Sequence, residues 1–246
     1  MLPLILYDIP STVEGGYWSP NTNKSLGRYV LSYKGLPFEI DWVELPDIAP
    51  RMKEIGARAT RYRDGSDVYT LPVLRDPNTG ALVTDSFDIA VYLDKTYPEK
   101  PVFPKDTNGL ICAVESAYFN QISLAYKFLV VRGVEVLGDR SAEFYATTRE
   151  KYFNQKFADF SPEGPERDQH WAALEKVFTA AKTWYDKTDG RWLMGDTFSY
   201  ADIVIACCLV WFKMVLHDDE WEKVAAWHDG QWGRLLADVE SECKVF

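Results

Sequence analysis

The sequence predicts an α/β domain followed by an all-α domain, and three observations support this prediction. Strand and helix patterns alternate through residues 1–97, proline then recurs at every third position from Pro98 to Pro104, and strand patterns are absent beyond it. Proline stops helices and favours extended connections. We therefore expect a first domain at 1–97, a linker at 98–106 and an all-helical domain at 107–246.

The first domain is expected to follow the order β-α-β-α-β-β-α. Short apolar or alternating runs predict its strands, and one-sided apolar periodicity predicts its helices. The expected strands are 3–7, 38–43, 69–74 and 81–84, and the expected helices are 21–34, 47–56 and 85–93, with 57–67 as a loop. A strand–helix–strand unit followed by a hairpin and a closing helix is the layout of a thioredoxin-like domain.

The second domain contains a clear helix-start signal. Ser199 is placed to act as an N-cap and Asp202, three residues later, completes a capping box, while Phe198 and Ile203 form a hydrophobic staple. This arrangement fixes the start of a buried helix. The helices expected in the second domain are 109–137, 142–157, 166–187, 200–216, 220–226 and 232–241.

Composition excludes several function classes. The chain has 246 residues and a net charge of −10, which argues against a nucleic-acid partner because such proteins cluster cations. The longest apolar run, Ile203–Phe212, is far shorter than the roughly 20 residues that span a membrane. The first residues have no cationic segment before their apolar stretch, so no signal peptide is expected. These features predict a cytoplasmic protein without a membrane partner.

Metal binding and disulfides are not expected. His170, His217 and His228 lack the spacing of metal-ligand motifs. The cysteines form no C-x-x-C pair, and free cysteine usually behaves as a small buried hydrophobe. We therefore expect core packing for all of them, namely Cys112, Cys207, Cys208 and Cys243.

Three motifs resemble those of the cytosolic glutathione transferases, in the same order and at similar spacing. Gly195–Ile203 resembles the capping-box segment that opens the core helix of their all-α domain. Leu71–Leu74 resembles their strand with a cis-proline, and Asp85–Ser86 resembles their acidic-Ser pair. A finer pattern resembles a fungal, serine-type class related to the bacterial lignin β-etherases, and it comprises Trp18–Thr22, Tyr33–Pro37 and Trp42–Glu44.

The resemblance implies how glutathione is bound as co-substrate. With Pro72 in cis, the amide and carbonyl of Leu71 would face outward and pair with the cysteinyl backbone. Asp85 would bind the α-ammonium, and Ser86, with a helix N-terminus behind it, would bind the α-carboxylate. The simpler alternatives are a trans proline in an edge strand and ordinary N-capping by Asp85, and capping does not exclude binding.

The chemistry requires a glutathione thiolate, and a hydrogen-bond donor near the sulfur lowers the thiol pKa. Family members place a Tyr, Ser or Cys beside the glutathione sulfur. No cysteine precedes Cys112 here, so a cysteine-type enzyme is not expected. The serine-type pattern makes Ser19 the first candidate, as a neutral donor, followed by Asn21 and Asn23. Tyr7 fits this class less well. Helix capping is the structural alternative for Ser and Asn in this loop.

The glycyl carboxylate of glutathione needs a cation, and relatives supply it from the region around the second helix. Lys53 is our choice, with one such contact expected at most, because most charges there suit a solvated face. The basic residues of this region are Arg51, Lys53, Arg58, Arg61 and Arg63.

Aromatic residues make up 15% of the chain, more than packing alone leads us to expect. Most should fill the helical core. Trp18, Tyr118, Phe119 and Tyr126 are our candidates for a cleft that binds hydrophobic aromatic molecules.

The resemblance thus implies a homodimeric enzyme. It would conjugate glutathione to aromatic electrophiles in detoxification or cleave aryl ethers. The alternative is a ligandin-like protein that binds aromatic compounds or polyphenols with weak catalysis. A relative that has lost glutathione is disfavoured by Leu71–Pro72 and Asp85–Ser86.

Overall fold

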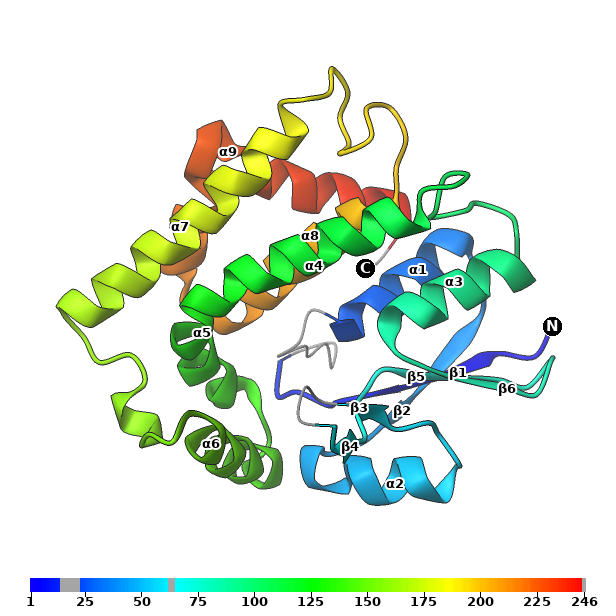
Figure 1. Cartoon of the computed structure of the whole chain (residues 1–246), viewed down its shortest axis with the longest axis horizontal. Coiled ribbons are helices and arrows are strands. Elements are labelled where there is room, and N and C mark those ends of the chain that lie inside the picture. Colours follow the sequence, from blue (N-terminus) through cyan, green and yellow to red (C-terminus); the bar gives the residue numbers. More distant parts are fainter. Residues whose placement is uncertain (14–22, 62–64, 245–246) are drawn as a thin grey trace.

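The computed structural model describes residues 1–13, 23–61 and 65–244. It contains a small sheet with helices on both faces, followed by a larger helical domain that packs against it (Figure 1). This architecture confirms the predicted thioredoxin-like N-terminal domain and all-helical C-terminal domain.

The main sheet has the strand order β2-β1-β5-β6, with β1 and β2 parallel and β5 antiparallel to both β1 and β6. Its side chains alternate between two apolar clusters. Leu4 and Leu6 join the cluster that contains α1 and α3, whereas Ile5 and Tyr7 face the cluster that contains Met52 of α2. The elements are β1 Leu4–Asp8, α1 Asn23–Lys34, β2 Phe38–Trp42, α2 Ile48–Glu54, β5 Val73–Asp76, β6 Ala81–Thr84 and α3 Ser86–Thr96.

Two details differ from the sequence prediction. The strand expected at 69–74 begins only at Val73, since Pro72 has no N–H to donate to a ladder. The expected loop at 57–67 contains a short antiparallel pair, β3 Thr60–Arg61 and β4 Asp67–Val68. The chain therefore reaches the main sheet later than its apolar pattern suggests.

The helical domain follows the predicted order with more breaks. The single helix expected at 109–137 is two α-helices separated by a 3-10 turn at Ser123–Ala125. The two helices expected after residue 220 form one long element, interrupted at Trp227–Gly230 by non-helical backbone. The elements are α4 Asn108–Ile122, α5 Tyr126–Gly133, α6 Asp139–Phe153, α7 Pro165–Tyr185, α8 Tyr200–Val215 and α9 Asp218–Cys243.

The predicted capping box opens α8, the central helix of the domain. Oδ2 of Asp202 accepts the Ser199 amide at 3.0 Å, and Oδ1 accepts the Tyr185 hydroxyl at 3.0 Å and the Leu193 amide at 2.8 Å. Burial raises the pKa of Asp202 to about 6, although these hydrogen bonds oppose the rise. Almost every residue of α8 is buried, so the capping box anchors the core.

The segment between α3 and α4 is itself part of the core. Val102 and Phe103 are buried, and the Val102 carbonyl accepts the Tyr200 amide at 2.8 Å. Asp94 of α3 accepts the amides of Val102 and Phe103, each at 2.9 Å, and pairs with Lys34 of α1. These contacts join both domains through the connecting segment.

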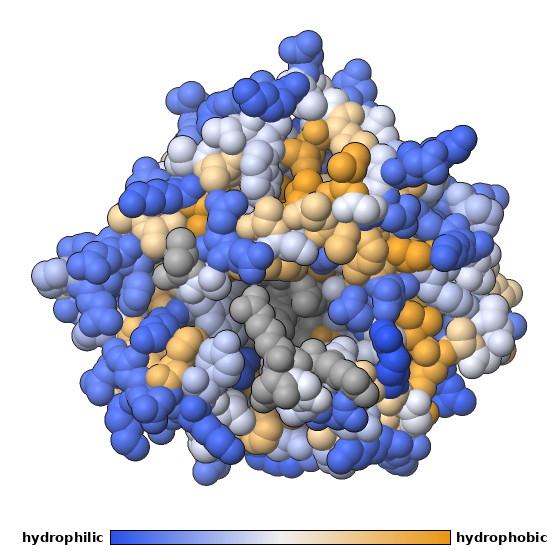
Figure 2. Space-filling view, viewed as in Figure 1, coloured by the Kyte–Doolittle hydropathy of each residue, from blue (hydrophilic) through white to orange (hydrophobic). Residues whose placement is uncertain are grey.

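The surface is mostly polar in the view of Figure 2, with hydrophobic residues in separate patches. Among the helices that the structure describes, none is long and apolar enough to cross a membrane.

Candidate functional site

A cavity of about 770 Å³ lies between the two domains. Three parts of the chain form its walls: the β3–β4 region, the first turn of α3, and α4 of the helical domain. The lining residues are Arg58, Ala59, Thr60, Asp67, Asp85, Phe87, Asp88, Cys112 and Glu115.

Asp85 is the N-cap of α3 and has an unusual backbone conformation, with φ at 86°. A positive φ costs energy for a residue with a side chain, and such conformations concentrate at functional sites. The carboxylate stabilises the turn, because Oδ1 accepts the amides of Phe87 at 2.9 Å and Asp88 at 3.4 Å. Among the described residues, Oδ2 has no hydrogen-bond donor, so it is available to a ligand.

The surroundings of Asp85 favour a cationic ligand. Burial raises the pKa of Asp85, and the Asp88 carboxylate adds to the rise. The two amide hydrogen bonds and Arg58 act in the opposite direction. Arg58 is exposed and pairs with Asp88 at 2.9 Å, so its charge is largely screened by solvent.

Glu115 of α4 faces the same cavity from the helical domain. Burial raises its pKa to about 7, and repulsion from Asp85 contributes to the rise. The Tyr200 hydroxyl donates to Oε1 of Glu115 at 3.4 Å, which opposes it. The Tyr200 ring packs against the rings of Phe87 and Phe103, with centroid distances of 5.6 Å and 5.1 Å. Sequence reasoning did not single out Glu115, because its neighbours come from distant parts of the chain.

Leu71 and Pro72 lie at the entrance to β5, and the peptide bond between them is cis, as the sequence motif predicts. Helix α1 packs closely over this turn. A Cβ on Gly27 would lie 3.2 Å from Cδ1 of Leu6 and 3.9 Å from Cβ of Pro72, so glycine permits the close approach. Ser86, the first residue of α3, is buried at its N-terminus.

The thiolate-stabilising candidates fall largely outside the described residues. Trp18, Ser19 and Asn21 lie outside them, and Asn23 is the first residue of α1, with no described side chain. Tyr7 is buried in the apolar cluster that contains Met52 of α2.

Lys53 does not line the cavity. Its ammonium lies over the Tyr69 ring, 5.4 Å from the ring centroid, on the exposed side of α2. Arg51 is engaged with Asp41 and Glu54, each at 3.0 Å. Among the described basic side chains of this region, Arg58 is the one in the cavity wall.

The aromatic candidates divide into buried and partly buried residues. Tyr118 is fully buried in the helical core, and its ring centroid lies 6.4 Å from that of Trp184. The expectation that Tyr118 lines a cleft is therefore corrected. Helical periodicity did not distinguish the core face of α4 from its cavity face. Phe119 and Tyr126 are partly buried, and Tyr126 packs against both apolar clusters.

Cys112 corrects another expectation. Cys207, Cys208 and Cys243 are buried as predicted, but Cys112 is exposed and lines the cavity one helical turn before Glu115. The sequence contained a hint of this exposure. Cys112 follows the apolar Ile111, which is buried in the core, and consecutive residues of a helix point to different faces.

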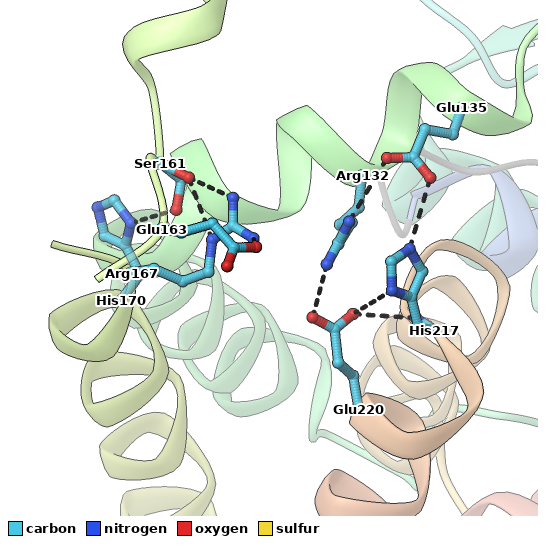
Figure 3. A network of polar contacts seen from close by, with 8 residues as sticks. All are labelled: Arg132, Glu135, Ser161, Glu163, Arg167, His170, His217 and Glu220. Carbon is cyan, nitrogen blue, oxygen red and sulfur yellow. Dashed lines mark hydrogen bonds and ion pairs between the residues drawn. The ribbon is translucent and has the colours of Figure 1, made fainter. Parts of the chain in front are cut away.

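The histidines belong to structural networks away from the cavity. Figure 3 shows His170 beside Ser161 and Arg167, and His217 beside Glu135, Arg132 and Glu220. His228 contacts Thr179 and Trp232. Within the described ranges, no group of three or more His, Cys, Asp or Glu side chains is placed to hold a metal ion.

Comparison with known families decides the identity. The glutathione S-transferase N-terminal domain matches residues 18–96, and the C-terminal domain of the same family matches residues 109–241. The chain belongs to the glutathione S-transferase family. One match lies in each structural domain, and the N-terminal match begins after β1.

Fungal glutathione transferases are among its similar structures. A glutathione S-transferase of Ceriporiopsis subvermispora, solved in complex with glutathione, is 38% identical over 100% of this chain and 99% of its own, with a TM-score of 0.92. Glutathione transferase GSTFuA2 of Phanerochaete chrysosporium is 32% identical over 98% of both chains, with a TM-score of 0.89. The glutathione S-transferase-like protein ustS of Aspergillus flavus is 29% identical over 95% of this chain and 88% of its own.

Proposed function

We propose that this protein binds glutathione at the N-terminus of α3 and activates its thiol for attack on hydrophobic aromatic electrophiles. The observation that carries the proposal is Asp85, held in a positive-φ conformation with Oδ2 unbonded among the described residues, in the wall of an interdomain cavity. A glutathione transferase of Ceriporiopsis subvermispora with the same fold was solved with glutathione bound.

The γ-glutamyl group of glutathione suits this arrangement. Its α-ammonium would pair with the Asp85 carboxylate. Its α-carboxylate would accept hydrogen bonds from Ser86 at the N-terminus of α3, where the helix dipole favours an anion. The Leu71 backbone would pair with the cysteinyl residue.

Glutathione then supplies the nucleophile, and the protein contributes proximity and stabilisation of the thiolate. In a serine-type mechanism, the Ser19 hydroxyl donates to the sulfur, with Asn21 and then Asn23 as the next candidates. The glycyl carboxylate pairs with a cation of the α2 region. Lys53 and Arg58 are the candidates for this contact, and Arg58 lies in the cavity wall, where it pairs with Asp88.

The finer assignments rest on family resemblance. We place the protein in the cytoplasm as a homodimer of the fungal class related to the lignin β-etherases, acting in detoxification or aryl-ether cleavage. We assign glutathione binding to residues 1–97, the linker to 98–106 and the hydrophobic substrate site to 107–246. Trp18, Phe119 and Tyr126 would contact the substrate, whereas the burial of Tyr118 argues against such a role.

Kinetic measurements test this function. The wild type should conjugate glutathione to 1-chloro-2,4-dinitrobenzene, and Ser19→Ala should reduce kcat/KM by roughly 100-fold if Ser19 stabilises the thiolate. Asn21→Ala and Asn23→Ala serve as matched variants of the same loop. Unchanged turnover in Ser19→Ala would remove Ser19 and transfer the role to whichever asparagine variant is impaired.

The ligandin-like alternative is distinguished by the same preparation. Tight binding of a polyphenol with negligible conjugation of any electrophile would favour sequestration over catalysis. Tyr126 is partly buried and its ring lies beside those of Phe153 and Trp211. This aromatic cluster is the observation that supports binding of an aromatic ligand.

A further inference from the structure

Two carboxylates from different domains line the described cavity without an ion-pair partner. Asp85 is at the start of α3, and Glu115 projects from α4. Within the described part of the chain, the only hydrogen bond of Glu115 is the one from Tyr200 at 3.4 Å, and neither carboxylate forms a salt bridge. Asp88, in the same wall, differs because it is exposed and pairs with Arg58.

We propose that Glu115 is a second binding residue for the γ-glutamyl ammonium of glutathione, acting together with Asp85 from the helical-domain part of the cavity lining. This inference rests on the proposed function. It adds a contact from the helical domain of the same chain, so glutathione would bridge α3 and α4. The substrate class follows from this chemistry. It consists of thiol peptides whose γ-glutamyl residue carries a free α-ammonium beside its own α-carboxylate.

The geometry explains why a cation belongs between these groups. Two carboxylates that repel each other across a partly buried cavity are both stabilised when a positive charge lies between them. Tyr200 keeps Glu115 in place, since its ring packs against Phe87 and Phe103 and its hydroxyl donates to Oε1. Tyr200 of α8 is thus the described side chain that orients Glu115 at the cavity.

Binding is then linked to a proton. Burial and Asp85 hold the pKa of Glu115 near 7, so at pH 6 most molecules carry a protonated Glu115. The ammonium favours the carboxylate form and displaces that proton to solvent. Among the described residues, the other ionisable groups that line the cavity or contact Glu115 are Asp85 and Asp88 of α3, Tyr200 of α8, Cys112 of α4, and Arg58 and Asp67 of the β3–β4 region.

The test uses S-methylglutathione, whose blocked sulfur removes thiol ionisation from the measurement. Calorimetric titration at pH 6, 7 and 8, in buffers of different ionisation enthalpy, gives both Kd and the number of protons released. For the wild type we expect Kd to fall about tenfold from pH 6 to pH 8, with nearly one proton released at pH 6 and almost none at pH 8.

Glu115→Gln should lose this pH dependence and bind roughly 100-fold more weakly at pH 8, because a charge-assisted contact is removed and the release of nearly one proton at pH 6 requires a coupling of about that size. Asp88→Asn is the matched control, since it removes a carboxylate of the same cavity, and it should keep the wild-type proton release. The S-methyl analogue with a glutaryl group in place of γ-glutamyl lacks the ammonium. It should bind the wild type and Glu115→Gln with similar affinity.

The outcomes separate this inference from the proposed function. If the wild type fails to bind S-methylglutathione, both are overturned. If it binds, but Glu115→Gln has the same affinity and the same proton release, Glu115 is not a ligand of the ammonium and the proposed function stands. Thermal unfolding at pH 6 verifies that the Gln variant is folded, which an isosteric change at a partly protonated carboxyl should permit.

Discussion

Nζ of Lys34 lies 2.8 Å from Oδ1 of Asp94, and the two side chains are almost removed from solvent. The ammonium also donates to the carbonyls of Glu99 at 2.9 Å and Lys100 at 3.2 Å. This ion pair therefore connects the end of α1 to α3 and to the segment that leads into the helical domain.

Lys34→Met should be strongly destabilising. It leaves the largely buried Asp94 carboxylate without its cation, and breaking one side of a buried pair costs about 3–5 kcal/mol. Urea denaturation measures the free energy of unfolding. Lys95→Met, which changes the exposed residue next to Asp94, should alter it by less than about 0.5 kcal/mol. Equal effects in the two variants would contradict a special role for Lys34.

Asp85→Asn should separate stability from binding. An amide oxygen can still cap α3, and Asn tolerates positive φ, so the free energy of unfolding should change by less than about 1 kcal/mol. The lost charge should weaken glutathione binding by roughly 10- to 100-fold. Asp85→Ala should lose both properties. Retention of full affinity by the Asn variant, measured by calorimetry, would remove Asp85 from the ammonium site.

Asp202→Asn should remove a pH dependence of stability. The pKa of Asp202 is raised to about 6 in the folded protein, above the usual 3.8, so its contribution is most favourable below pH 3.8. It is lost as the pH rises through 6, with an upper limit of about 3 kcal/mol.

Thermal unfolding at pH 5, 6 and 7 provides the measurement. The Asn variant should be less stable at each pH, because it cannot accept all of the hydrogen bonds of the carboxylate, but its slope across this range should be shallower. A slope identical to that of the wild type would show that Asp202 does not titrate there.

Tyr200→Phe should shift the pH dependence of glutathione binding and have only a modest effect on the free energy of unfolding. The Tyr200 hydroxyl lowers the pKa of Glu115, so removing it should shift the midpoint of S-methylglutathione affinity to higher pH. The ring contacts with Phe87 and Phe103 remain, and the unfolding free energy should fall by less than about 2 kcal/mol. A midpoint that stays in place or moves down would contradict the contact between Tyr200 and Glu115.

Local chemistry made part of this architecture predictable. Ser199 and Asp202 carry their capping geometry in four consecutive residues, and the start of α8 follows from them. The N-cap role of Asp85 is local in the same sense. The two domains and the order of their elements followed from periodicity and proline placement, since these signals depend on neighbours along the chain.

The residues that sequence reasoning missed depend on contacts between distant segments. Glu115 resembles any charged residue on a solvated helix face until Tyr200 and Asp85 are placed beside it. Cys112 and Tyr118 lie on one helix, yet one lines the cavity and the other is fully buried, because other helices cover only one face of α4. The late start of β5 has a local cause in Pro72, which apolar patterning does not detect.

The burial of Val102 and Phe103 has a consequence for recombination between family members. A crossover placed in the proline-rich segment would give Asp94, Tyr200 and this pair of residues to different parents, although they share one set of contacts. Functional chimeras should therefore inherit α3, the connecting segment and the start of α8 together, and selection should act on them as one unit.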